Sequence, residues 1–118
     1  MQGIPVYYAQ GADHDEPAFK KLAEQAQRCG SCALVVCAEE QTGALRDAPG
    51  LGSLRLFFEH LGEEPPRSRG LPALAYRLEP ARLLDLLDDR RVSVVIYVPR
   101  NAAELRHFTL AYPECASV

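Results

Sequence analysis

The sequence lacks the long apolar runs and the nucleotide-binding motifs that mark several large functional classes. Its longest strongly apolar run, Val92–Val98, is far shorter than the ~20 residues that span a bilayer. Residues 1–4 have neither the basic start nor the apolar stretch of a signal peptide, so we expect a cytoplasmic location. The chain contains no GxGxxG and no phosphate-loop sequence, which argues against nucleotide binding by the common routes.

Basic residues are also few. The chain has 13 of them, only two being lysines, against 16 acidic residues, which gives a net charge of −3. The basic residues are scattered, whereas a nucleic-acid-binding protein usually gathers them on one face. We therefore expect neither nucleic acid nor a membrane among the partners.

Length and composition are those of an ordinary globular protein. The chain has 118 residues, of which 47% are hydrophobic and 25% charged, so we expect one domain over residues 1–118. A chain of this length buries enough surface to fold without a metal or a disulfide. The four cysteines suit a reducing compartment if they stay reduced.

The informative feature is an alternation of short apolar runs with segments of helical pattern. The apolar runs are Ile4–Ala9, Ala33–Ala38, Leu71–Leu78 and Val92–Val98. This alternation predicts an α/β three-layer domain whose four-stranded sheet is mostly parallel. The second and fourth runs are almost uninterrupted, so we expect helices on both faces of the sheet and full burial of Val35 and Val95.

Four helices follow from the spacing of apolar residues and from capping signals. We expect them over residues 17–29, 53–61, 80–91 and 101–112. In the second, Leu54, Phe57, Phe58 and Leu61 fall at helical spacing after a Ser53 cap and before Gly62.

A short stretch, Arg69-Gly70-Leu71-Pro72-Ala73-Leu74, resembles the segment of thioredoxin-like proteins in which a cis-proline opens the third core strand. The resemblance implies an alternative, a thioredoxin-like fold without a catalytic CxxC, because that motif belongs after the first strand, where this chain has Gln10 to Asp13. That family also joins its next two strands by a hairpin, whereas the pattern here predicts a helix over Glu79 to Arg91.

Candidate chemistry gathers in the loop after the first predicted strand. In a parallel sheet, ligands bind beyond the carboxyl ends of the strands. The loop there contains Asp13, His14, Asp15 and Glu16, whose side chains could ligate a divalent metal or act as general acid and base. The alternative, which we favour, is that these acidic residues complement the positive end of the following helix. We therefore expect no metal and no cofactor.

Cys29-Gly30-Ser31-Cys32 has the CxxC spacing of redox pairs and of half a zinc site. A redox pair needs a helix N-terminus to lower the pKa of its first thiol, but this motif follows the end of a predicted helix. A zinc site needs two further ligands, and neither Cys37 nor Cys115 completes an obvious set. The motif is thus predicted to be a turn that ends a helix.

Two functional hypotheses follow. The first is a small non-catalytic module, of a regulatory, inhibitor or immunity type, whose partner is another protein. The alternative is a small enzyme, either metal-assisted at the loop after the first strand or redox-active through its thiols.

Overall fold

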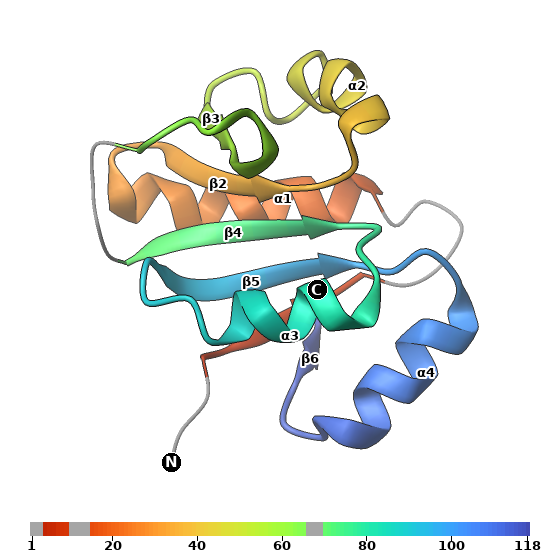
Figure 1. Ribbon diagram of the computed structural model, residues 1–118. Helices are drawn as coiled ribbons and strands as arrows, with labels where there is room; N and C mark the ends of the chain where they lie inside the picture. Colours follow the sequence, from red (N-terminus) through yellow and green to blue (C-terminus); the bar gives the residue numbers. More distant parts are fainter. Residues whose placement is uncertain (1–3, 10–14, 66–69) are drawn as a thin grey trace.

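The computed structural model describes residues 4–9, 15–65 and 70–118, which form a parallel sheet between two layers of helices (Figure 1). The sheet has six strands in the order β3-β2-β4-β5-β1-β6, and every neighbouring pair is parallel. The strands are β1 (Val6–Tyr8), β2 (Cys32–Val36), β3 (Arg55–Phe58), β4 (Leu71–Tyr76), β5 (Val92–Val98) and β6 (Ala116–Ser117). The predicted α/β three-layer class is confirmed, but the predicted number of four strands is wrong.

Helices cover both faces of the sheet. They are α1 (Asp15–Ala26), α2 (Thr42–Arg46), α3 (Pro80–Leu87) and α4 (Ala102–Ala111), with 3-10 turns η1 (Gln27–Cys29), η2 (Glu39–Gln41) and η3 (Glu59–Leu61). α1 contacts β2, β4 and β5 and lies behind the sheet in Figure 1, whereas α3 and α4 lie in front of it. Three of the four predicted helical regions therefore contain an α-helix. The exception is the second region, residues 53–61.

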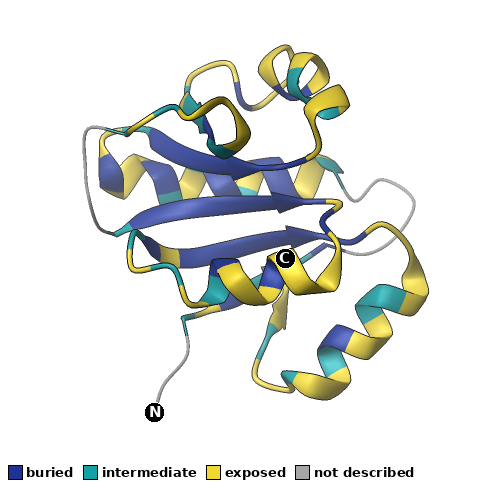
Figure 2. Ribbon diagram, in the orientation of Figure 1, coloured by how far each residue is buried: buried dark blue, intermediate teal, exposed yellow. Residues whose placement is uncertain are grey.

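The core is two apolar layers, one on each side of the sheet, and the central strands β2, β4 and β5 are buried at every residue except Ser93 (Figure 2). On the α1 side, Phe19, Leu22 and Leu45 pack on the strands, and on the other side Leu83 and Phe108 do so. Val35 and Val95 are both 0% exposed, which confirms the expectation drawn from the uninterrupted apolar runs.

The helix predicted over residues 53–61 is wrong. Arg55–Phe58 is instead the edge strand β3, in which Phe57 pairs with Leu34 and Phe58 with Val35 of β2. Pairing sends the two phenylalanines to opposite faces, since Phe58 is buried in the α1-side core and Phe57 packs against the opposite layer. Burial on both faces of the sheet outweighs the helical spacing, which would have offered only one buried stripe. β6 was also missed, because two residues carry no pattern.

The thioredoxin-like alternative is wrong as well. β4 and β5 are parallel and joined by α3, where that family has a hairpin. Among the described residues every peptide bond is trans, including the one before Pro72. Pro72 is accommodated inside a central strand because the β4–β5 register shifts between Leu71 and Pro72, a place where a proline can sit without breaking a regular ladder.

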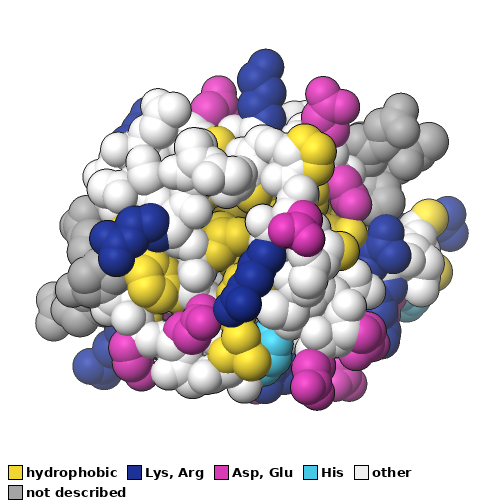
Figure 3. Space-filling model, turned by 90° about the horizontal axis from the view of Figure 1, so that it is seen from above, with side chains coloured by type: hydrophobic (Ala, Val, Ile, Leu, Met, Phe, Trp, Pro, Cys, Tyr) yellow, Lys and Arg dark blue, Asp and Glu magenta, His cyan; other side chains and the backbone are white. Residues whose placement is uncertain are grey.

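A side chain occupies one backbone amide on the outer edge of β3. The backbone N–H of Phe58 donates to Glu63 Oε1 at 2.9 Å, and Arg46 pairs with the same carboxylate at 3.1 Å while lying over the Phe58 ring. Figure 3 looks down on this edge and shows charged side chains of both signs among the hydrophobic ones. An occupied edge amide is unavailable to a further strand, which protects the sheet from edge-to-edge pairing.

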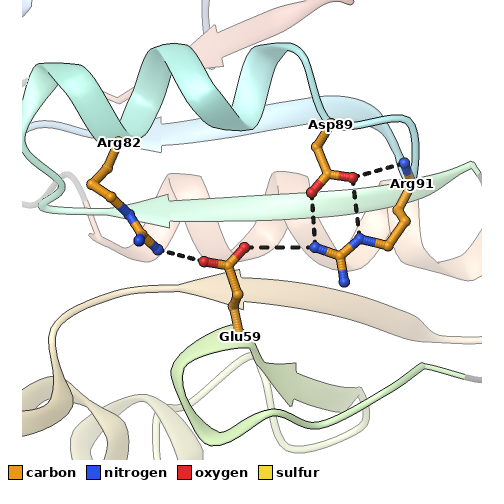
Figure 4. Close-up of polar contacts among 4 residues, drawn as sticks. All are labelled: Glu59, Arg82, Asp89 and Arg91. Carbon is orange, nitrogen blue, oxygen red and sulfur yellow. Dashed lines mark hydrogen bonds and ion pairs between the residues drawn. The ribbon is translucent and has the colours of Figure 1, made fainter.

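Glu59 forms ion pairs that connect η3 to α3 and to the loop after it (Figure 4). Its carboxylate pairs with Arg82 of α3 and, at 3.6 Å, with Arg91. Arg91 also donates to Asp89 through two nitrogens at 2.8 and 3.1 Å. These bonds from Arg91 hold the pKa of the Asp89 carboxyl below its usual value, so this charge pair persists under mildly acidic conditions.

Candidate functional site

Two of the four residues predicted to carry chemistry can be placed. Asp13 and His14 lie outside the described residues. Asp15 and Glu16 form the first turn of α1, where a negative charge is favoured by the exposed N–H groups of the helix. Glu16 is exposed and Asp15 is half-buried, because Asp15 faces the end of β4.

A groove separates α1 from α2 and the segment that follows it. It encloses about 740 Å³, within the usual range for ligand-binding pockets. Its floor and walls are mainly apolar side chains and small residues, listed here with the polar ones: Asp15, Glu16, Phe19, Lys20, Ala23, Ala44, Leu45, Asp47, Ala48, Pro49, Gly50 and Tyr76. The two predicted residues that the structure describes thus lie at its rim.

Two aromatic rings line this α1–α2 groove. The rings of Phe19 and Tyr76 lie 6.2 Å apart at 30° to one another, and both side chains are almost fully buried. The Tyr76 hydroxyl donates to Asp15 Oδ2 at 2.8 Å. Burial, and then the neighbouring Asp15 carboxylate, raise the pKa of Tyr76 above its usual value, so the hydroxyl stays a donor that orients Asp15.

The rim of the groove is acidic. Asp15, Glu16 and Asp47 supply three carboxylates against the single ammonium of Lys20. An apolar floor beneath a negative rim suits a ligand that carries an apolar group next to a positive one.

Sequence reasoning missed the other wall of this groove. None of the four predicted helices includes Ala44, Ala48 or Pro49, and Tyr76 was placed only in the apolar run Leu71–Leu78. One signal could have found the Tyr76–Asp15 contact, because a buried tyrosine hydroxyl needs a hydrogen-bond partner. Nothing in the sequence indicates that residues 44–50 lie opposite α1.

The CxxC occupies the turn predicted for it. η1 ends at Cys29, and Gly30 and Ser31 follow with φ of 68° and 61°, the left-handed backbone that commonly ends a helix. The Cys29 thiol donates to the Gly70 carbonyl at 2.9 Å, and the Cys32 thiol donates to the Gly30 carbonyl at 3.6 Å. Both thiols are buried at the amino end of β2, at the opposite end of the strands from the groove rim.

Other chemical groups are dispersed. Within residues 4–9, 15–65 and 70–118, no three His, Cys, Asp or Glu side chains are grouped so as to hold a metal ion. None of the helices in these ranges is long and apolar enough to cross a membrane. Burial raises the pKa of the Cys37 thiol to about 11, so this thiol is protonated at neutral pH.

Compared with family models, with curated proteins and with solved structures, the chain matches none of them.

Proposed function

We propose that the protein is a non-catalytic protein-binding module of the cytoplasm, acting as a regulator, inhibitor or immunity-type protein. In this proposal the α1–α2 groove holds a segment of a partner protein. The observation that supports it is the groove itself, an apolar cleft of about 740 Å³ whose walls come from two helical segments on one face of the sheet.

The side chains of the groove define the segment that would fit. Small residues such as Ala23, Ala44 and Ala48 let a partner backbone approach closely, and the Phe19 and Tyr76 rings offer a surface for an apolar side chain. The carboxylates of Asp15, Glu16 and Asp47 favour a lysine or arginine beside that apolar residue. The partner is therefore a protein with an exposed apolar–basic segment, and neither nucleic acid nor a membrane.

The proposal is tested by selecting a displayed library of random peptides on the purified protein. Peptides that combine a large apolar residue with lysine or arginine should be enriched. Ala44 is exposed and lines the groove, so Ala44→Arg fills the groove and adds a competing cation without disturbing the core. The selected peptides should lose their binding to this variant.

The matched control is Ala103→Arg, which makes the same change at an exposed alanine on α4, on the other face of the sheet. It should leave peptide binding unchanged. Failure of the library to enrich any peptide, or equal binding to Ala44→Arg, would show that the groove is not a protein-binding site.

A further inference from the structure

A second cleft opens where β2 and β4 end. The two strands are neighbours in the sheet, with Leu34 paired to Ala73, but the chain leaves them in opposite directions. β2 leads through η2 to α2 on the α1 side, whereas β4 leads to α3 on the other side. Such a divergence leaves a crevice beyond the carboxyl ends of the strands, the usual ligand site of open parallel sheets. Here the crevice encloses about 650 Å³ and shares no lining residue with the α1–α2 groove.

Three arginines from three separate segments line this β2–β4 crevice. Arg77 follows β4, Arg82 belongs to the first turns of α3, and Arg100 follows β5. His60, from η3, lies on the same lining. Arginine is the side chain best suited to bind a phosphate group, because its planar fork donates two parallel hydrogen bonds.

Arg77 has no carboxylate partner among the residues that the structure describes. Its backbone is left-handed, with φ of 53°, a conformation that is costly for a residue with a side chain. Its N–H donates to the Val98 carbonyl at 2.7 Å, which fixes this backbone against β5. The guanidinium lies 5.3 Å from the centre of the Tyr76 ring and forms no ion pair with any carboxylate in the part of the chain that the structure describes.

The other two arginines are positioned by carboxylates yet keep donors to spare. Arg82 donates to Glu59 through one nitrogen (Figure 4), and Arg100 donates to Glu104 through Nε at 2.8 Å and through one terminal nitrogen. A guanidinium has five N–H groups, so each of these can also bind an anion. Both side chains are about half exposed.

We propose that the β2–β4 crevice binds a small organic phosphate, with Arg77, Arg82 and Arg100 contacting the phosphate group. Three guanidinium groups match the three oxygens and the double negative charge of a phosphate monoester better than they match a single carboxylate. The crevice is much larger than a phosphate ion, and Ala38 and Leu78 supply an apolar part of its lining on which the organic moiety can lie. Glu40 and Glu79 are also on the lining, and their charges oppose the ligand, so the affinity should be moderate.

The test uses three probes, ribose 5-phosphate, inorganic phosphate and ribose, with binding followed by amide NMR shifts and calorimetry. Ribose 5-phosphate should shift the amides of residues 38–41, 77–79, 81 and 82, inorganic phosphate should bind more weakly, and ribose should not bind. Added salt should weaken the binding.

Arg77→Asn keeps a residue that tolerates the left-handed backbone and should weaken binding about tenfold, the loss expected for one charge-assisted hydrogen bond. Glu79→Gln should tighten binding severalfold.

The control is Arg106→Gln, which removes one positive charge from an exposed position on α4 outside the crevice lining and should change binding less than twofold. The proposal is overturned if neither phosphate probe binds at millimolar concentration. It is also overturned if Arg106→Gln weakens binding as much as Arg77→Asn, because the attraction would then be general. If inorganic phosphate bound as tightly as ribose 5-phosphate, the proposal that the ligand carries an organic group would be wrong.

Discussion

At the scale of single residues, Val95 marks the centre of the molecule. Its backbone pairs with Ala73 of β4 on one side and with Val6 of β1 on the other. Its side chain is fully buried and lies in the same apolar layer as Tyr97 and Phe108. No charged residue is buried anywhere in the described part of the chain, so a charge at this position would have no opposite charge beside it.

We therefore expect Val95→Asp to abolish stable folding, since an unpaired buried carboxylate costs more than the few kcal/mol that single substitutions usually cost. Urea denaturation followed by circular dichroism measures this effect. The control is Ser93→Asp, which puts the same side chain at an exposed position of the same strand and should change the free energy of unfolding by only about 0.5 kcal/mol. Similar denaturation curves for Val95→Asp and the parent protein would contradict the burial of this layer.

Two buried titratable groups predict a loss of stability at alkaline pH. Burial raises the pKa of Cys37 from 9.0 to about 11 and that of Tyr97 from 10.0 to about 12. In the unfolded chain both groups lose their protons at the lower pH values, so the unfolded state gains stability first as the pH rises. These two groups should leave the free energy of unfolding unchanged below about pH 9 and make it fall steadily between about pH 9 and pH 12.

Tyr97→Phe removes one of these two groups and should flatten the fall above pH 10. The effect is on the order of 2 kcal/mol, since one pKa unit corresponds to about 1.4 kcal/mol. Denaturation across the pH series measures it. If the variant and the parent lost stability in parallel, the raised pKa of Tyr97 would be wrong.

At the scale of elements, what the sequence predicts depends on where an element lies in the sheet. β2 and β5 are central and buried on both faces, so their apolar runs identify them. β3 is an edge strand in which only Phe58 is fully buried, and its two phenylalanines happen to fall at helical spacing with Leu54 and Leu61. Its identity comes from its pairing with β2, which is a long-range contact that local spacing does not report.

Substitution of Phe58 tests whether Arg55–Phe58 is a strand. Its side chain is 0% exposed and packs in the α1-side core, so Phe58→Ala should lower the free energy of unfolding by about 3–4 kcal/mol. Phe57 is only half-buried on the opposite face, and Phe57→Ala should cost distinctly less. Chemical denaturation of the two variants distinguishes the strand from a helix. In a helix both phenylalanines would lie on one apolar stripe, and the two substitutions would lower the free energy of unfolding by similar amounts.

At the scale of the whole molecule, the fold class follows from the sequence but the arrangement of the clefts does not. The alternation of strands and helices is local information, whereas the strand order β3-β2-β4-β5-β1-β6 is decided by contacts between distant segments. The α1–α2 groove and the β2–β4 crevice both depend on that order. The rule that ligands bind beyond the carboxyl ends of strands applies to this crevice too, because residues that follow β2 and β4, among them Glu40 and Glu79, line it. The roles suggested for Asp13 and His14 stay predictions.

All six strands belong to one sheet, and we expect the chain to unfold as one cooperative unit. Far-ultraviolet circular dichroism, which reports backbone structure, and tyrosine fluorescence, which reports packing, should therefore give the same denaturation midpoint. Two separated transitions would contradict the expectation of a single domain over residues 1–118.

β1 leaves the ribosome before the other five described strands, yet its partners β5 and β6 are the last of them. Val6 pairs with Val95, and Tyr7 pairs with Ala116. β2, β3 and β4 are synthesised closer together and can associate earlier, while the N-terminal strand stays unpaired until β5 has been translated. During that interval a Val-Tyr-Tyr segment is exposed to chaperones and to neighbouring nascent chains. The time needed to translate the chain from β1 to the end of β5 thus sets how long this strand is open to aggregation.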